Sequence, residues 1–250
     1  MVFMGHRSES EKRFCASEVG IILPTYGEAQ NIAKLIDALE NLKIDSTILV
    51  IDDSSPDRTA EIVRQKQKQY SNVLLIIRPS KSGLGTAITD GFRTFLSSTY
   101  QPKYVVTMDA DFSHKPQELP ELLSTIREEN CGIVIGSRYC KGGQIAGWPT
   151  TRKIISKTAN FIARTSLRLK MYDCTSGFRC YSTEFLRQAI DNLHSHTYEI
   201  QIETVRQASL RKFEVKETPI FFENRKQGKS KLTLAEIKGY LTYTLKAITK

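Results

Sequence analysis

The sequence of 250 residues has no long apolar segment. No stretch approaches the ~18 to 20 consecutive apolar residues that a helix needs to span a bilayer, so we do not expect this chain by itself to cross a membrane. Its opening is mostly polar and lacks the apolar centre of a secretory signal. We expect residues 1–18 to form a mobile tail.

Cysteine is scarce, and its spacing is irregular. The five cysteines are odd in number and include no C-x-x-C pair: Cys15, Cys131, Cys140, Cys174 and Cys180. The pattern therefore favours neither a disulfide framework nor a zinc site. A reducing, cytosolic setting is the default expectation for such a chain.

Acidic residues are absent from one long stretch of this chain, whose formal net charge is +9. Between Asn130 and Tyr172 there is no Asp or Glu, but there are Arg138, Lys141, Arg152, Lys153, Lys157, Arg164, Arg168 and Lys170. A basic block of this kind suits phosphates, anionic lipid headgroups or nucleic acid. On charge alone, a solvated basic face is about as common.

Short apolar runs recur along the first half of the chain. They cover residues 19–23, 46–51, 72–77, 103–108 and 132–136. Continuous apolar runs of this length are typical of strands in a sheet that is covered on both faces. The segments between them read as helices at 28–42, 57–70, 86–98 and 116–129, with Asp57 and Pro116 as suitable helix starts. The alternation predicts one α/β domain with a mostly parallel, doubly wound sheet and helices on both faces.

Polar residues follow each predicted strand, where a doubly wound sheet binds its ligands. The segments are "PTYGE" (24–28), "DDSSPD" (52–57), "RPSKSGLGTA" (78–87), "DADFSH" (109–114) and "SRY" (137–139). The two glycines of "SGLGTA" could hold a phosphate, but the segment lacks the spacing of the known phosphate loops, so we favour a tight turn into a helix.

Two carboxylates stand one residue apart in "MDADFSH". In an extended segment Asp109 and Asp111 would point the same way, and one would hold its proton unless solvent or a cation screens the pair. An isolated pair of this kind is more often a solvated turn than a ligand site. We interpret His114, beside a proline that starts a helix, as a capping or packing residue rather than a catalytic one.

The order of the motifs resembles a known family. "PTYGEAQNI", "VIDDSSPDRT", "SGLGTA", "MDADFSHKP", "GSRYCKGG", "GWPTTRKIISKTAN", "TSGFRCY" and "ENRKQGKSKL" follow one another as in the family-2 glycosyltransferases. More narrowly, they resemble the dolichyl-phosphate mannosyltransferases that use GDP-mannose. The resemblance covers roughly residues 19–250, and it implies a GT-A nucleotide-sugar-binding fold over residues 19–231.

The resemblance also implies a donor site and a metal site. The residues that match the donor site are Pro24, Tyr26, Glu28, Ile51, Asp53, Asp109, Ala110, Asp111, Arg138, Arg225 and Lys231. The first five would hold guanine and ribose. Asp52 is the weaker candidate beside Asp53, because strand alternation points it the other way, and a buried structural carboxylate is the alternative. Asp109 and Asp111, joined by Ser113, would hold Mg²⁺ or Mn²⁺ against the donor diphosphate. Arg225 and Lys231 resemble a mobile lid over that diphosphate.

The resemblance also implies an acceptor site for a lipid phosphate, and cations are needed where two anionic phosphates approach each other. Arg138 and Arg152 are the expected clamps, with Ser156 one turn further at i+4. The expected catalytic set is then Asp109, Asp111, Arg138 and Arg152. Because a phosphate oxygen is already anionic near neutral pH, no general base is required, and attack on C1 opposite GDP inverts the anomeric centre. Glu203 stands about where related enzymes with hydroxyl acceptors have an acid-base carboxylate, so it is a secondary candidate.

Two segments have a composition suited to a membrane surface. Residues 151–170 mix Ile154, Ile155, Phe161, Ile162 and Leu169 with six cations, and residues 232–250 predict an amphipathic helix. Packing against the sheet is the alternative for both. We expect the chain to work at the cytosolic face of a membrane: the endoplasmic reticulum in a eukaryote, the plasma membrane in a prokaryote. The resemblance suggests a small membrane-embedded partner subunit.

Two rival functions stay open at this point. One is a polyprenyl-phosphate glucosyltransferase that uses UDP-glucose, whose metal and phosphate sites would look alike. The other is a nucleic-acid-binding module that uses residues 138–170. Aromatic residues are not interleaved with the cations as a stacking platform needs, so we expect no nucleic-acid partner. A degenerate regulatory subunit is disfavoured, because both carboxylates and all four expected cations are present.

Overall fold

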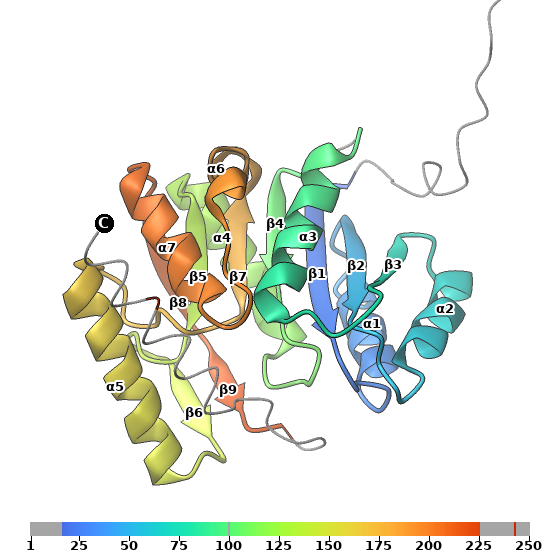
Figure 1. Ribbon diagram of the computed structural model, residues 1–250, viewed down its shortest axis with the longest axis horizontal. Coiled ribbons are helices and arrows are strands. Elements are labelled where there is room, and N and C mark those ends of the chain that lie inside the picture. The colour runs from blue at the N-terminus through green and yellow to red at the C-terminus, as the bar shows by residue number, and fades with distance from the viewer. Residues whose placement is uncertain (1–16, 100, 226–242, 244–250) are drawn as a thin grey trace, which may run out of the picture.

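The computed structural model describes residues 17–99, 101–225 and 243, and in these residues one mixed sheet forms the centre of the fold (Figure 1). Its order is β3-β2-β1-β4-β7-β5-β8. The strands are β1 (Val19–Thr25), β2 (Ser46–Asp52), β3 (Val73–Ile77), β4 (Tyr104–Thr107), β5 (Ile133–Ser137), β7 (Arg179–Ser182) and β8 (Val215–Pro219). A small second sheet pairs β6 (Gln144–Ala146) with β9 (Phe221–Glu223).

Helices connect and cover these strands. They are α1 (Ile32–Glu40), α2 (Thr59–Gln69), α3 (Leu84–Ser97), α4 (Leu119–Glu129), α5 (Thr150–Leu167), α6 (Thr183–Ala189) and α7 (Ile200–Leu210). Short 3-10 turns, η2 (Pro116–Glu118) and η3 (Ile190–Asn192), precede α4 and follow α6. The doubly wound α/β fold predicted from the apolar runs is therefore confirmed.

The sheet is mostly parallel, as the sequence predicts. Its single antiparallel strand within the described residues is β7, which pairs with β4 on one side and β5 on the other. The five predicted apolar runs correspond to β1 to β5. The sequence analysis did not predict β7 or β8, because "RCYS" and "VKETP" are short and lack a continuous apolar pattern.

The core has two layers, one on each face of the sheet. Ile22 of β1 packs with Phe92 and Phe185, on the side of α3, α6 and α7. Its neighbour Ile21 packs with Ile36 and Leu123, on the side of α1 and α4. Figure 1 shows α3 and α7 in front of the sheet. Because successive side chains of a strand point to opposite faces, only a continuously apolar strand serves both layers.

Helix α1 begins later than predicted, at Ile32 instead of residue 28. Gly27 has a positive φ of 72°, and the backbone carbonyl of Glu28 then accepts from the amides of Asn31 and Ile32, which forms a turn before the helix. The other predicted starts agree closely with the structure. Asp57 accepts a hydrogen bond from the Thr59 amide at the start of α2, and Pro116 opens η2.

The strand order reverses at β1. The chain passes from β1 to β2 and β3 on one side and then returns to β4 on the other, so β1 pairs with both β2 and β4. In doubly wound sheets a crevice opens outside the carboxyl ends of the two strands at such a point. The loops after β1 and β4 therefore lie where a ligand site is expected.

The predicted ends of the chain are only partly covered by the described residues. Glu18 belongs to the fold and not to a tail, because it forms an ion pair with Arg127 at 2.7 Å and its carbonyl accepts from the Lys103 amide. The predicted tail up to residue 16 and nearly all of the predicted helix at 232–250 lie outside the described residues. Among the helices described, none is both long and apolar enough to cross a membrane.

Candidate active site

A hollow of about 100 Å³ opens at the carboxyl ends of β1, β2 and β4. Of the predicted donor residues, it brings together Pro24, Tyr26, Glu28, Asp53, Asp109, Ala110, Asp111 and Arg225. We call it the donor hollow. Two predicted donor residues do not line it: Ile51 is completely buried in the core, and Arg138 lies outside this hollow. Lys231 lies outside the described residues.

The two carboxylates of "MDADFSH" lie in a tight turn after β4. Phe112 has a positive φ of 60°, which turns the chain back directly after Asp111. Asp111 is 5% exposed, and its Oδ1 accepts from the amide of Ser113 at 3.0 Å and from its hydroxyl at 2.6 Å. Ser113 therefore donates two hydrogen bonds to Asp111, which fix the direction of this carboxylate.

Arg225 stands against the other oxygen of Asp111. Its Nη2 atom is 3.1 Å from Asp111 Oδ2, and the side chains are mostly buried. Burial by itself would raise the pKa of Asp111, but the Ser113 hydrogen bonds and the charge of Arg225 outweigh it, so the pKa is lowered. The turn thus holds an ionised carboxylate with a cation beside it.

Asp109 is the more accessible carboxylate of the two. Its side chain is 35% exposed, and it lines the donor hollow and a second, adjoining hollow that is described below. Gly177, in the segment before β7, lies so close that a Cβ atom there would stand 3.2 Å from Asp109 Oδ1. The glycine of "TSGFRCY" therefore leaves room for this carboxylate at the end of the neighbouring strand.

His114 is a packing residue, as predicted. It is 1% exposed, and its ring stacks on Phe178 and meets Phe222 edge-on, with both ring centroids at 5.3 Å. Burial lowers the pKa of His114 despite the nearby charges of Asp109 and Asp111. The neutral ring packs beneath the acidic turn.

Asp53 is oriented by the loop that follows β3. Its Oδ1 forms an ion pair with Arg78, and its Oδ2 accepts from the amides of Ser82 and Gly83 at 3.2 and 3.3 Å. Gly83 has φ of 104° and precedes α3, so "SGLGTA" is the tight turn into a helix that the sequence predicts. Asp52 is a buried carboxylate that accepts from Thr25 Oγ1 at 2.8 Å, which agrees with the structural alternative considered for it.

A second hollow, of about 600 Å³, adjoins the first. We call it the acceptor hollow. The two share Leu84, Asp109, Tyr198 and Arg225. The acceptor hollow brings together the predicted Ser113, Arg138, Arg152 and Ser156. Its remaining wall is largely apolar and comes from α5, with Ile154, Ile155 and Ile162. It thus combines arginines near the acidic turn with an apolar extension.

Arg138 is held by a carboxylate that the sequence analysis did not identify. Its Nε and Nη2 atoms donate to the two oxygens of Asp173, each at 2.7 Å, and Nη2 also donates to Thr175. Both members are buried, with Asp173 at 0% exposure. Burial by itself would lower the pKa of Arg138, but Asp173 raises it, so the pair stays charged. The expectation of a freely available clamp is therefore corrected, because Asp173 offsets the charge of Arg138.

Arg152 has a different environment. Its guanidinium lies 4.2 Å from the ring centroid of Trp148, and its Nη1 donates to Asn224 at 3.3 Å. No carboxylate among the described residues lies within ion-pair distance of it. Burial lowers the pKa of Arg152, and so does repulsion from the charges of Arg225 and Arg138. An anion beside Arg152 would relieve that repulsion.

Glu203 does not face the site, which corrects its assignment as an acid-base candidate. It is 4% exposed and lines neither the donor nor the acceptor hollow. Its carboxylate accepts from the amides of His194 and Ser195, at 3.0 and 2.9 Å. Glu203 therefore fixes the loop before α7, whose backbone approaches Gly83 and Gly85.

Four residues of the site were not identified from the sequence. Lys81 places its ammonium 4.3 Å from the ring centroid of Tyr26, Tyr198 lines both hollows, Trp148 stacks on Arg152, and Asp173 holds Arg138. One signal was available for Asp173. It is the first acidic residue after the long acid-free block, so it is the first carboxylate able to pair with the cations of that block.

Comparisons with known proteins agree with this geometry. A family model described as "Glycosyl transferase family 2" matches residues 20–190. This chain belongs to that family. The family includes an undecaprenyl-phosphate mannosyltransferase of Micrococcus luteus, to which the chain is 38% identical over 214 residues, covering 85% of this chain and 86% of the relative. A polyprenol monophosphomannose synthase of Mycolicibacterium smegmatis is 36% identical, and the match covers 87% and 82% of the two chains.

The fold also resembles solved structures. One is glucosyl-3-phosphoglycerate synthase of Mycobacterium tuberculosis in complex with Mn²⁺, UDP-glucose and phosphoglyceric acid. It matches with a TM-score of 0.66 and 18% identity, over 98% of this chain and 86% of that chain. At this identity the likeness concerns the fold. The family-2 glycosyltransferase adopts the GT-A fold that the motif order implied.

Proposed function

We propose that this chain transfers mannose from GDP-mannose to the phosphate of dolichol or another polyprenol, and that the product is a β-linked mannosyl phosphate. Two relatives match over more than four-fifths of the chain. One is named undecaprenyl-phosphate mannosyltransferase, and the other polyprenol monophosphomannose synthase. The proposal accounts for the donor hollow and for an acceptor hollow with a largely apolar wall. The two hollows share the carboxylate of Asp109.

The environment of Arg152 is the observation that carries this proposal. A cation half-buried among other cations, with no carboxylate in ion-pair distance among the described residues, suits an anionic substrate group. The apolar wall of α5 continues from it, as a phosphate with a hydrocarbon chain requires. Ser156, one turn after Arg152, would donate to the same phosphate.

The donor side fits a divalent cation. Asp109 and Asp111 offer only oxygen ligands, and the guanidinium of Arg225 already neutralises one of those oxygens. Within the described residues no group of three or more acidic, His or Cys ligands occurs, which suits Mg²⁺ or Mn²⁺ held by two carboxylates and the substrate's phosphates. When bound, such an ion stabilises the negative charge that grows on the leaving diphosphate. Ser113 would orient Asp111 rather than coordinate directly.

The reaction needs no proton acceptor. A phosphate oxygen of the polyprenyl phosphate forms the new bond to C1 of mannose, and the bond from C1 to GDP breaks with its electron pair going to GDP. Arg152 would hold the attacking phosphate, while Arg225 would bind the leaving diphosphate. Glu203 accepts hydrogen bonds from the backbone amides of residues 194 and 195 and does not face the reacting groups.

The long hydrocarbon tail of the acceptor implies that the protein works at a membrane. Exposing it to water costs about 0.8 kcal/mol per CH₂, so the site must come to the lipid. The proposed location is the cytosolic face, of the endoplasmic reticulum in a eukaryote or the plasma membrane in a prokaryote. A small membrane-embedded subunit is the proposed partner for stable residence.

Transfer assays with matched donors test the proposal. Radiolabelled GDP-mannose, UDP-glucose and GDP-glucose would each be incubated with polyprenyl phosphate and Mn²⁺, and lipid-soluble, acid-labile label would be counted. We expect label only from GDP-mannose, with GDP and not UDP as the tighter competitor. Label from UDP-glucose alone would replace the mannose assignment with the glucosyltransferase alternative, and label from no donor would exclude both.

A further inference from the structure

A third hollow, of about 590 Å³, lies on the other side of α5 from the acceptor hollow. Its lining includes Lys153, Lys157 and Arg164 of α5, together with Phe161 and Tyr172. The helix positions i, i+4, i+8 and i+11 form one stripe, which explains why these side chains share a face. The acceptor hollow is lined by a different stripe, which contains Arg152, Ile155 and Ile162.

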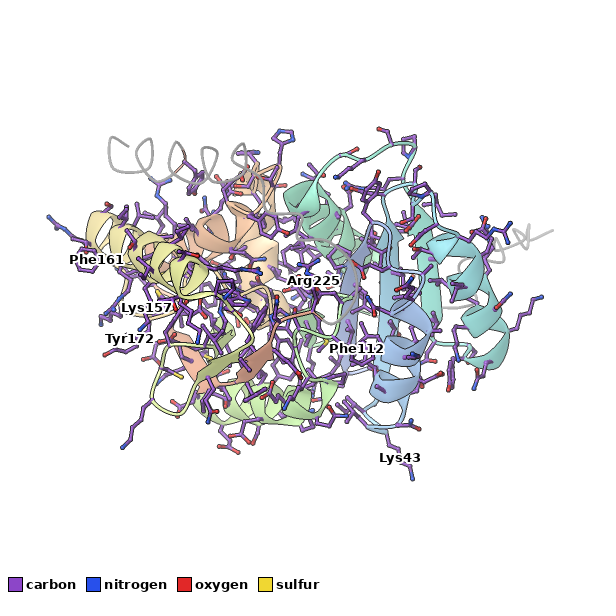
Figure 2. All side chains as sticks on the ribbon, turned by 90° about the horizontal axis from the view of Figure 1, so that it is seen from below. Lys43, Phe112, Lys157, Phe161, Tyr172 and Arg225 are labelled. Carbon is purple, nitrogen blue, oxygen red and sulfur yellow. The ribbon has the colours of Figure 1, made fainter. Side chains whose placement is uncertain are left out.

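The third hollow is separated from the reacting groups. Of its lining residues, only Arg138 also lines the acceptor hollow, and that guanidinium is held by Asp173. Lys157, Phe161 and Tyr172 lie together at one end of the molecule in Figure 2, apart from Arg225 at its centre. A ligand in this hollow would therefore contact neither the acidic turn nor Arg152.

Unlike Arg138, the three α5 cations of the third hollow have no anionic partner in the described residues. None of Lys153, Lys157 and Arg164 stands within ion-pair distance of a carboxylate there. The Nε atom of Arg164 is buried and has no hydrogen-bond partner in that part of the chain, and its guanidinium stacks on Tyr172 at 4.3 Å. A buried donor left without a partner costs free energy, and a phosphate oxygen would satisfy it.

Exposed apolar side chains border these cations. Phe161 is 67% exposed, Tyr172 is 52% exposed, and Ile154, seven residues before Phe161 and on the same side of α5, is 59% exposed. Binding of a free phosphate ion would not explain why an exposed phenylalanine stands at the edge of the site. The headgroup boundary of a bilayer does, because it accepts cations and partly inserted apolar rings side by side.

We propose that the third hollow binds the phosphate of an anionic phospholipid headgroup, with Phe161 inserted into the boundary beside it. The site is distinct from the acceptor phosphate site and does not require the proposed mannose transfer. It would set the tilt of α5 on the membrane, so that the apolar wall on the acceptor side faces the bilayer. Each cation contributes about a fivefold factor to binding at an anionic surface, and salt weakens it.

Vesicle flotation with matched charge variants tests the site. The Lys153→Gln/Lys157→Gln variant would be compared with Lys43→Gln/Lys68→Gln, which removes the same charge from exposed lysines near α1 and on α2. Figure 2 shows Lys43 at the lower edge of the view, well away from Lys157. Phosphatidylcholine vesicles with and without phosphatidylglycerol would be used, and thermal melts would establish that both variants fold.

We expect phosphatidylglycerol to increase flotation of the wild-type chain. In the Lys153/Lys157 variant this increase should be smaller by a factor of about ten or more. The control variant should lose less than about twofold, and Phe161→Ser should weaken flotation on both vesicle types. Mannose transfer to a short, water-soluble acceptor phosphate should stay at the wild-type level in the two lysine variants. Inorganic phosphate and glycerol 1-phosphate, at concentrations matching the headgroup, should not displace the chain.

Three results would overturn the proposal. Equal losses in the two lysine variants would reduce the effect to net charge. Flotation that does not depend on phosphatidylglycerol would remove the headgroup from the account. Displacement by inorganic phosphate would assign the hollow to a free anion. Absence of mannose transfer in every chain, the wild type included, would refute the proposed function and leave the flotation comparison intact.

Discussion

The donor side and the acceptor side of the candidate site hold their charges in different ways. On the donor side Asp53, Asp109 and Asp111 stand at strand ends, and backbone amides or nearby side chains fix the carboxylates of Asp53 and Asp111. On the acceptor side Arg138 depends on a carboxylate 35 residues away, while Arg152 rests on an aromatic ring. The first arrangement is largely local to the sheet, and the second is assembled from distant segments.

This difference suits two kinds of substrate. A nucleotide diphosphate is compact and needs a small, rigid set of acceptors and cations. A lipid phosphate brings one phosphate group and a long apolar chain, which suits a half-buried arginine beside the apolar wall of α5. The buried pair of Arg138 and Asp173 separates the acceptor hollow from the third hollow and keeps one cation in a fixed place between them.

The largest expected effect concerns this buried pair. Asp173→Asn leaves Arg138 charged, buried and without its partner, so we expect it to lower the free energy of unfolding by about 3 to 5 kcal/mol. Urea denaturation measures this. The control is Asp37→Asn, which breaks the half-exposed ion pair with Lys66 and should cost no more than ~1 kcal/mol. Equal effects of the two changes would mean that the Arg138 pair does not anchor the acceptor side.

The next effect concerns the acidic turn. We expect Asp111→Asn to reduce transfer by more than roughly 100-fold, because loss of a partner one step removed from a metal already costs about 10- to 100-fold. The measurement is the initial rate at saturating Mn²⁺. Ser113→Ala, which keeps the carboxylate and removes the hydrogen bond that orients it, should have the smaller effect. A rate for Asp111→Asn within a few-fold of wild type would contradict the proposed role of the carboxylates.

A smaller effect is expected away from the reacting groups. Glu203→Gln weakens the hold on the amides of residues 194 and 195, so we expect a loss of about 1 to 3 kcal/mol in the free energy of unfolding. The transfer rate, measured where the variant is fully folded, should stay within a few-fold of wild type. A loss of several orders of magnitude with unchanged stability would restore Glu203 as an acid-base residue.

The same comparison explains how far the sequence could predict the molecule. Continuous apolar runs identify β1 to β5, since a strand buried on both faces needs them, whereas β7 and β8 are short and partly polar and their place depends on tertiary pairing. The carboxylates of the donor side were predictable because strand ends bring them together.

The partners of individual side chains were not predictable from local pattern. Nothing near Arg138 in sequence indicates that Asp173 will bind it, and helical spacing alone does not show that Glu203 turns toward a loop instead of the site. Ile51 matched a family position, yet its side chain packs into the core on one face of the sheet and is completely covered. These outcomes depend on how elements pack, which a one-dimensional pattern does not specify.

The division of the site into two sides is tested most directly by measuring donor and acceptor binding of one variant, Arg152→Ala. Calorimetry would give the affinity for GDP with Mn²⁺, and initial rates would give kcat/KM for polyprenyl phosphate. We predict a GDP affinity within about twofold of wild type and a loss of roughly 10- to 150-fold in kcat/KM for the acceptor, as expected for a hydrogen bond to a charged group. A comparable collapse in GDP affinity would contradict the division, because it would place Arg152 on the donor side.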